Sequence, residues 1–258
     1  MLTGKFENDV SMKKHLVLVH GYLGGSSQWA AQVSLFSQYF NVVTVDLPGF
    51  GLNHAMESPQ TIRGYADFVL NHLDHQGIDE FHLLGHSMGG MIVQEMTAIA
   101  PSRVNHLILY GTGPVGMLPN RFETIQESKR RVSADGPKAT GCRITATWFI
   151  QGAQATQYHV CAELAEKASL QAALAGLSAM EPWSGESYLT HIKSPTLVIW
   201  GDGDRTYQWS QPEQLWRNIA AAQLGVMPGC AHAAHLEKPH LFNALLMDFF
   251  QLQSTSAD

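Results

Sequence analysis

The chain has 258 residues, of which 45% are hydrophobic and 15% charged, and its formal net charge is −6. A chain of this length and composition can bury one large core, so we expect one α/β domain with an insertion and no general disorder. The negative charge and the scattered basic residues argue against a nucleic-acid partner.

Cysteine usage and the N-terminal segment bear on location. Cys142, Cys161 and Cys230 have no metal-ligand spacing, and their odd number is typical of reduced thiols in a cytosolic enzyme. Residues 1–14 lack an apolar signal segment, and no apolar run approaches the roughly 18 residues that span a bilayer. We therefore expect a cytoplasmic protein with no membrane partner, either a monomer or a homodimer.

In the first part of the chain, apolar runs alternate with helical patterns. A strand is predicted over 15–19, and it ends in the glycine-rich loop His20-Gly21-Tyr22-Leu23-Gly24-Gly25. The backbone N–H groups of such a loop can face a ligand. A helix is expected near 28–39, a second buried strand over 41–46 and a helix over 61–76, which Gly77 ends.

The segment 81–100 carries the strongest local signal. The apolar run from Phe81 predicts a buried strand, and helical spacing begins at Met88, so Ser87 stands at a sharp corner between them. Such a corner crowds its neighbours, and the glycines at 85 and 89 remove side chains that would collide. A serine there sits at a helix N-terminus that favours negative charge, which suits a nucleophile.

The second half resumes the alternation after an interruption. A strand is predicted over 104–110, no strand is evident between Gly111 and about His191, and the pattern returns with strands over 195–200 and 223–227 and helices over 211–220 and 239–252. Continuous apolar strands alternating with helices predict a parallel sheet covered on both faces. We expect a core of residues 1–113 and 191–258 and a helical lid of residues 114–190 over the sheet's carboxyl edge.

Five motifs in order along the chain resemble those of the α/β-hydrolase family. They are His20-Gly21, Asp46-Leu47-Pro48-Gly49-Phe50-Gly51, Gly85-His86-Ser87-Met88-Gly89-Gly90, Gly201-Asp202-Gly203-Asp204 and His232-Ala233-Ala234-His235-Leu236-Glu237-Lys238-Pro239. The resemblance covers nearly the whole chain, although the N-terminus is too short for the usual leading hairpin. It implies the α/β-hydrolase fold, with the lid inserted after the sixth strand of the family's sheet.

The same resemblance implies a Ser-His-Asp triad of Ser87, His232 and Asp204, because a serine needs a base to take its proton and an acid to orient that base. Asp202 is a rival for the acid, but the family pattern places the acid three residues after Gly201. His235 is a rival for the base and is expected to pack or to orient the loop.

The backbone N–H groups of Tyr22 and Met88 are the expected oxyanion-hole donors. No cofactor or metal is expected. The stretch 111–116 satisfies G-x-G-x-x-G, but Pro114 fits poorly in a phosphate turn and no second strand with a terminal acid follows. Asp202-Gly203-Asp204 could begin a calcium loop, but its sixth position holds Tyr207 where glycine is needed.

The substrate is less constrained by the sequence. His20, Trp148, Phe149 and Trp183 are candidate pocket residues, together with Met117, Leu118 and Phe122, although lid aromatics can equally form the lid's own core. Arg121, Arg130, Arg131 and Arg143 could bind a substrate carboxylate or form a solvated face.

The stretch Arg121–Gly136, followed by Trp148-Phe149, is similar to 3-oxoadipate enol-lactonases and related esterases, except that Thr147 stands where an arginine is often found. We expect a hydrolase of small-molecule carboxylic esters. The alternatives are a lactonase or a carbon–carbon bond hydrolase of ring-cleavage products, and, in another class, a hydrolase fold that only binds.

Overall fold

The computed structural model describes residues 13–119 and 121–253, and the sequence expectations for residues 1–12 and for the last five residues fall outside it. Its centre is a six-stranded parallel sheet in the order β2-β1-β3-β4-β5-β6. The strands are β1 His15–Val19, β2 Asn41–Val45, β3 Phe81–His86, β4 Val104–Tyr110, β5 Thr196–Gly201 and β6 Gln223–Met227. The predicted parallel sheet is thereby confirmed.

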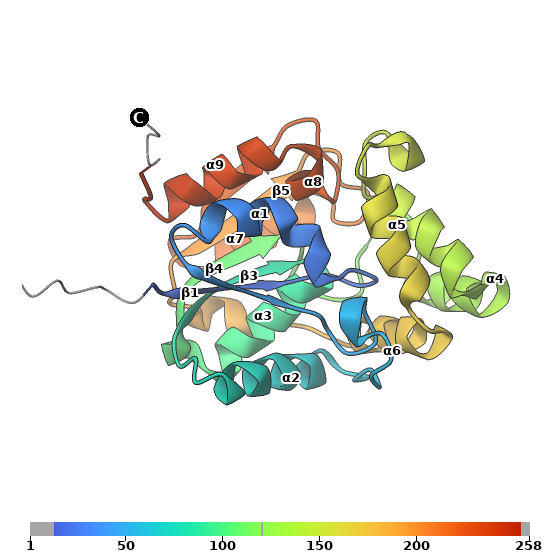
Figure 1. Cartoon of the computed structure of the whole chain (residues 1–258), viewed down its shortest axis with the longest axis horizontal. Coiled ribbons are helices and arrows are strands. Elements are labelled where there is room, and N and C mark those ends of the chain that lie inside the picture. The colour runs from blue at the N-terminus through green and yellow to red at the C-terminus, as the bar shows by residue number, and fades with distance from the viewer. Residues whose placement is uncertain (1–12, 120, 254–258) are drawn as a thin grey trace, which may run out of the picture.

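Helices cover both faces of this sheet (Figure 1). The α-helices are α1 Ala30–Phe36, α2 Ile62–His75, α3 Met88–Ile99, α4 Ile125–Ala146, α5 Tyr158–Lys167, α6 Leu170–Met180, α7 Ser210–Asn218, α8 Ala234–Glu237 and α9 Pro239–Phe249. Short 3₁₀ helices occupy Ser26–Trp29, Gly51–Asn53, Pro101–Arg103, Gly152–Gln154 and Glu186–His191.

The period-2 geometry of the strands divides the core into two layers. In β1, the side chains of Val17 and Val19 join the layer that packs against α2 and α3, while Leu16 and Leu18 join the layer against α1 and α9. The inner strands β1, β3 and β5 are buried on both sides along most of their length, so apolar residues dominate their sequences, which makes these strands easy to locate.

The segment between β4 and β5 is mainly helical, and Figure 1 shows α4, α5 and α6 beside the sheet at the end to which the strands point. We call residues 114–190 the inserted segment. Its two ends lie together, because Val115 and Ser184 form a β-bridge and Gly116 N donates to Trp183 O. Helix α4 is kinked at Gly136, whose φ is 83°, and at Pro137. The division of the chain into core and lid stays a prediction.

Candidate active site

Ser87 occupies the turn between β3 and α3, with φ 58° and ψ −119°. A non-glycine residue with this backbone conformation is strained, and such strain is concentrated at functional sites. The turn is tight because strand and helix touch: a Cβ at Gly85 would lie 2.3 Å from the carbonyl oxygen of Gly89. A Cβ at Gly89 would lie equally close, 2.3 Å, to the carbonyl oxygen of Val19. Gly85 is therefore required by the corner, and Gly89 by the close packing of α3 against the end of β1.

The loop after β1 packs directly on this turn. A Cβ at Gly21 would come within 2.8 Å of the Cβ of Ser87, so a larger residue there would displace the serine. The next residue, Tyr22, is buried, and its hydroxyl donates to the carbonyl oxygen of Ala173 in α6 at 3.0 Å. Tyr22 thus follows a glycine that contacts Ser87, and Met88, the first residue of α3, follows Ser87 itself.

Asp204 and His232 are joined in a buried pair. Asp204 follows β5, His232 follows β6, and the imidazole Nδ1 lies 2.8 Å from the carboxylate Oδ2 of Asp204. The other carboxylate oxygen, Oδ1, accepts the backbone N–H groups of Thr206 and Tyr207 at 2.7 and 3.1 Å. Both carboxylate oxygens are thus engaged, and the ring of His232 is left with Nε2 for any further partner.

Two other buried histidines lie next to His232, and among the residues described neither forms an ion pair with a carboxylate. His86 is hydrogen-bonded through Nε2 to the carbonyl oxygen of His232 at 2.9 Å, and His235 Nδ1 lies 3.1 Å from the Tyr110 hydroxyl. Burial, followed by the proximity of His232, lowers the pKa of His235 to about 3 and holds the pKa of His86 well below its ordinary value. Both therefore stay neutral near pH 7.

Ser87 and His232 line one small cavity of about 20 Å³, which is room for about one water molecule. Its roof comes largely from the inserted segment. The lining residues are Tyr22, Ser87, Met91, Gly116, Leu118, Arg121, Phe122, Ile125, Ile144, Trp148, Met180, Thr206, Tyr207 and His232. A larger surface groove of about 730 Å³ runs between α1 and α9 and contains none of the predicted site residues.

Only some of the candidate pocket residues reach this cavity. Trp148, Leu118 and Phe122 line it. His20 does not, because its Nδ1 is bonded to Gly21 O and its Nε2 accepts the N–H of Leu47, so it joins two loops. Phe149 faces a different hollow, and the indole of Trp183 donates to Glu95 in α3.

Tyr207 is a cavity residue for which the sequence predicted no such role. It is buried, and its ring stacks on His232 with a centroid distance of 5.6 Å and an interplanar angle of 13°. Burial raises the pKa of Tyr207 to about 12, against the opposing effects of the Ser87 hydroxyl and the Arg121 guanidinium nearby. The signal that could have located it is its position three residues after Asp204, at the carboxyl end of β5.

The loop that carries His232 is attached to the inserted segment. The carboxylate of Glu237 accepts the backbone N–H of Ile150 at 2.7 Å and that of Ala231 at 2.6 Å. In addition, Ala233 N donates to the carbonyl oxygen of Trp148 at 2.9 Å. These bonds connect the residues next to α4 with those on either side of the histidine.

The residues of the 111–116 glycine motif and of the Asp202 loop contact other parts of the protein. Gly113 O accepts from the Gln94 side chain, and a Cβ at Gly116 would lie 1.6 Å from the carbonyl oxygen of Met180. Asp202 accepts the N–H of Gly229 in the turn after β6. Within residues 13–119 and 121–253, no group of three or more His, Cys, Asp or Glu side chains is arranged to hold a metal. None of the helices in those ranges is long and apolar enough to cross a bilayer.

The sequence of the chain is similar to those of known hydrolases. It is 30% identical to a 2-hydroxy-6-oxononadienedioate/2-hydroxy-6-oxononatrienedioate hydrolase of Paraburkholderia phymatum, over 92% of this chain and 87% of that protein. It is 28% identical to a 2-hydroxy-6-oxo-6-phenylhexa-2,4-dienoate hydrolase of Burkholderia cepacia, over 94% and 89%.

Among solved structures, the enol-lactonase of Burkholderia xenovorans has the same fold, with a TM-score of 0.85 at 22% identity over 93% of this chain and 92% of that one. A family model described as "Alpha/beta hydrolase family" matches residues 16–245. The chain therefore belongs to the alpha/beta hydrolase family.

Proposed function

We propose that the protein is a serine hydrolase of small-molecule carboxylic esters, with Ser87 as nucleophile, His232 as general base and Asp204 as the acid that orients it. The observation that carries this proposal is the buried 2.8 Å contact between Asp204 and His232 in the wall of the cavity that Ser87 also lines. A serine is activated in this way by a base whose tautomer is fixed by a third group.

The proposed mechanism has two halves. The hydroxyl oxygen of Ser87 attacks the acyl carbonyl as His232 Nε2 takes its proton, and Asp204 stabilises the imidazolium that forms. The imidazolium then returns the proton to the departing alcohol, which leaves Ser87 acylated. In the second half, His232 takes a proton from water, whose oxygen attacks the acyl group, and the proton passes to Ser87 as the acid is released.

The negative charge on the tetrahedral intermediates needs fixed donors. We assign these to the backbone N–H groups of Tyr22, in the loop that packs on Ser87, and of Met88, the residue after Ser87. Losing one donor of this kind costs about a hundred- to a thousandfold in kcat. The stacked ring of Tyr207 covers one face of His232, which keeps water from that face and limits the orientations of the imidazole.

Active-site labelling and turnover test the proposal together. We expect a fluorophosphonate probe to label Ser87 and p-nitrophenyl butyrate to be cleaved with a burst of p-nitrophenol. Ser87→Ala should abolish both, and His232→Ala should lower both by at least about a thousandfold. Circular dichroism shows whether each variant is folded. Retention of most activity by either folded variant would reject the assignment.

The relatives favour a second candidate reaction. Two of them are named as hydrolases of 2-hydroxy-6-oxo-dienoates, so cleavage of a carbon–carbon bond beside a ketone is the alternative for the same residues. A lactone is a third substrate type with the same acyl chemistry. Comparing kcat/KM for p-nitrophenyl butyrate, an enol-lactone and a 2-hydroxy-6-oxo-dienoate separates the three. Turnover of only the dienoate or only the lactone would replace the ester assignment.

A hydrolase fold that only binds is the remaining alternative. It predicts no labelling of Ser87 in the folded protein and no turnover of any of the three substrates. A cytoplasmic location and the choice between monomer and homodimer stay predictions, which fractionation and sedimentation can test.

A further inference from the structure

Arg121 is the one cationic side chain among the described residues that line the cavity of Ser87 and His232. It lies in the loop between β4 and α4, at the beginning of the inserted segment. Its guanidinium carbon is 5.0 Å from the ring centroid of Phe122, another lining residue. The remaining lining residues are apolar or carry hydroxyl groups, apart from His232, and none of them is an Asp or a Glu.

The guanidinium is not fully paired. Among the residues that the structure describes, Nη1 of Arg121 is buried without a hydrogen-bond partner, and no carboxylate forms an ion pair with this side chain. Leaving a buried charged donor unsatisfied costs free energy, and an arginine does not escape by losing its proton. The pKa of Arg121 is lowered by burial, with Tyr207 and Glu123 acting in the opposite direction.

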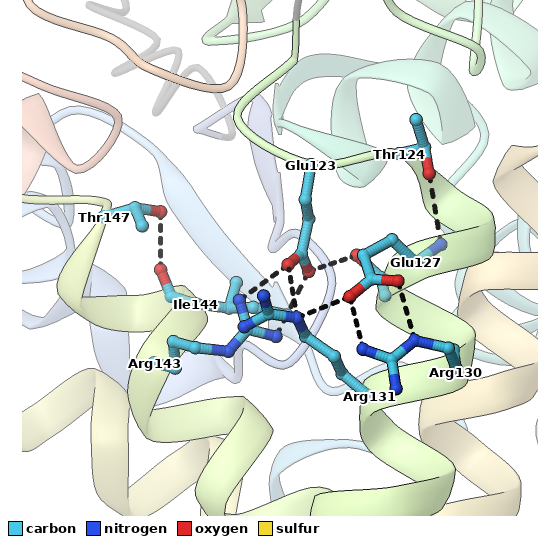
Figure 2. A network of polar contacts seen from close by, with 9 residues as sticks. Glu123, Thr124, Glu127, Arg130, Arg131, Arg143, Ile144 and Thr147 are labelled. Carbon is cyan, nitrogen blue, oxygen red and sulfur yellow. Dashed lines mark hydrogen bonds and ion pairs between the residues drawn. The ribbon is translucent and has the colours of Figure 1, made fainter.

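The other candidate arginines are engaged elsewhere, as Figure 2 shows. Arg143 binds Glu123 through two nitrogens, at 2.8 and 3.2 Å, while Arg130 and Arg131 both bind Glu127. This network ties the two halves of the kinked helix α4 to each other. Glu123 and Glu127 are thus both engaged by other arginines, and Glu181, which lines a neighbouring hollow with Arg121, is paired with Lys129.

The position before Trp148 supplies no charge either. Thr147 stands there, and its hydroxyl donates to the carbonyl oxygen of Ile144 at 2.6 Å, within the end of α4 (Figure 2). A cation that recognises an acidic substrate must therefore come from another element. Arg121 approaches the cavity from the opposite end of α4.

On the assumption that Ser87 is the nucleophile as proposed above, we infer that Arg121 binds a carboxylate of the substrate. The substrates are then acyl compounds that carry a carboxylate several bonds from the carbonyl that Ser87 attacks. A carboxylate would complete the donor set of Nη1 in a charge-assisted hydrogen bond, and its charge would be neutralised inside an otherwise apolar roof. Because the cavity has room for about one water molecule, such a substrate has to displace part of that roof.

The test compares two esters that differ in one charge. Mono-p-nitrophenyl adipate carries a free carboxylate, and p-nitrophenyl methyl adipate carries the same chain with that carboxylate masked. The wild-type protein should favour the anionic ester in kcat/KM. Arg121→Gln should reduce the ratio of anionic to neutral kcat/KM by about ten- to a hundredfold, the usual range for one hydrogen bond between charged groups. Arg121→Lys, which keeps the charge, should lose less.

Arg130→Gln is the matched control, because Arg130 is an exposed arginine of the same segment that is bonded to Glu127 outside the cavity. It should leave the ratio unchanged. A purely structural role for Arg121 makes a different prediction for the free protein. Such a role predicts a lower melting temperature for Arg121→Gln, whereas an unpaired guanidinium held for a ligand predicts an equal or higher one.

Binding without turnover keeps this inference separate from the proposed reaction. Calorimetric titration of Ser87→Ala with monomethyl adipate should show binding that Arg121→Gln weakens by at least about tenfold. If the wild-type protein cleaves both esters but Arg121→Gln leaves the ratio and the titration within about twofold, the carboxylate site is wrong and the hydrolase proposal stands. If Ser87 is not labelled and neither ester is cleaved, the hydrolase proposal fails, and the titration alone decides on Arg121.

Discussion

Replacing Asp204 by asparagine tests which proton position the buried pair enforces on His232. In the wild-type structure, the backbone N–H groups of Thr206 and Tyr207 both point at Oδ1, and His232 Nδ1 points at Oδ2. An asparagine must place its carbonyl oxygen where the two backbone donors are, because its amide N–H₂ would oppose them. The amide nitrogen therefore takes the place of Oδ2.

That substitution reverses the hydrogen bond to His232. The amide N–H can only donate to Nδ1, so the imidazole proton moves to Nε2, the atom that should receive the proton of Ser87. The ring then cannot act as base in its stable tautomer. In serine proteases, the equivalent change lowers kcat by about 10⁴-fold, which corresponds to about 5.5 kcal/mol of lost transition-state stabilisation.

The assay is kcat/KM for p-nitrophenyl butyrate, with the rate of fluorophosphonate labelling as a second measure. Asp202→Asn is the matched control, since Asp202 lies two residues away and its carboxylate accepts only the exposed N–H of Gly229 among the bonds described. We expect less than about a threefold effect from this surface change, in keeping with a free-energy change within about 0.5 kcal/mol. If Asp202→Asn were the more damaging variant, or Asp204→Asn kept activity within tenfold, the acid would be misassigned.

Three further predictions concern stability. Ser87→Gly should raise the free energy of unfolding by about 1 kcal/mol while abolishing turnover, because glycine adopts the φ of 58° without strain; a less stable variant in thermal melts would contradict this. Gly89→Ala should lower the free energy of unfolding by at least about 3 kcal/mol, because the added Cβ would lie 2.3 Å from Val19 O. Gly77→Ala should lower it by only about 1 kcal/mol, because a Cβ there meets nothing within 4 Å and only the positive φ is unfavourable. Equal midpoints of urea unfolding for the two variants would refute the steric reason. Lowering the pH from 7 to 5 should reduce the free energy of unfolding by about 2 kcal/mol through His235, whose pKa in the folded protein is about 3. Below about pH 6.5 this histidine binds a proton in the unfolded chain but not in the folded one, so stability falls as the pH falls toward 3. Urea unfolding of His235→Gln should show a flatter pH dependence, and an unchanged slope would contradict this source.

The sheet was largely predictable because its strands are mostly apolar runs, and the inner ones are buried on both sides. The strands over 15–19, 104–110 and 223–227 have the predicted bounds, and the others differ by one or two residues at their ends. The inserted segment was predicted only as helical. Its long helix α4 contains Pro137, which ordinarily ends a helix, and the left-handed Gly136 before it lets the chain continue at a new angle. That geometry depends on packing and on the arginine–glutamate network, which leave no periodic pattern in the sequence.

In the candidate site, too, residues within motifs could be predicted, whereas positions that depend on packing could not. Ser87, Asp204 and His232 could be named because each stands at a strand end within a motif, and their catalytic roles stay predictions. The pocket lining could not be derived, because facing a cavity depends on how distant helices pack. Phe149 and Trp183 have the same aromatic character as Trp148 but contact other parts of the molecule, whereas Tyr207 reaches the cavity from a loop without any aromatic pattern.

The hydrogen bonds around Trp148 and Glu237 join the inserted segment to the loop of His232 beside the cavity. Because of these bonds, a displacement of the residues that follow α4 would also move the backbone next to His232. The position of the proposed general base therefore depends on the packing of the inserted segment as well as on Asp204.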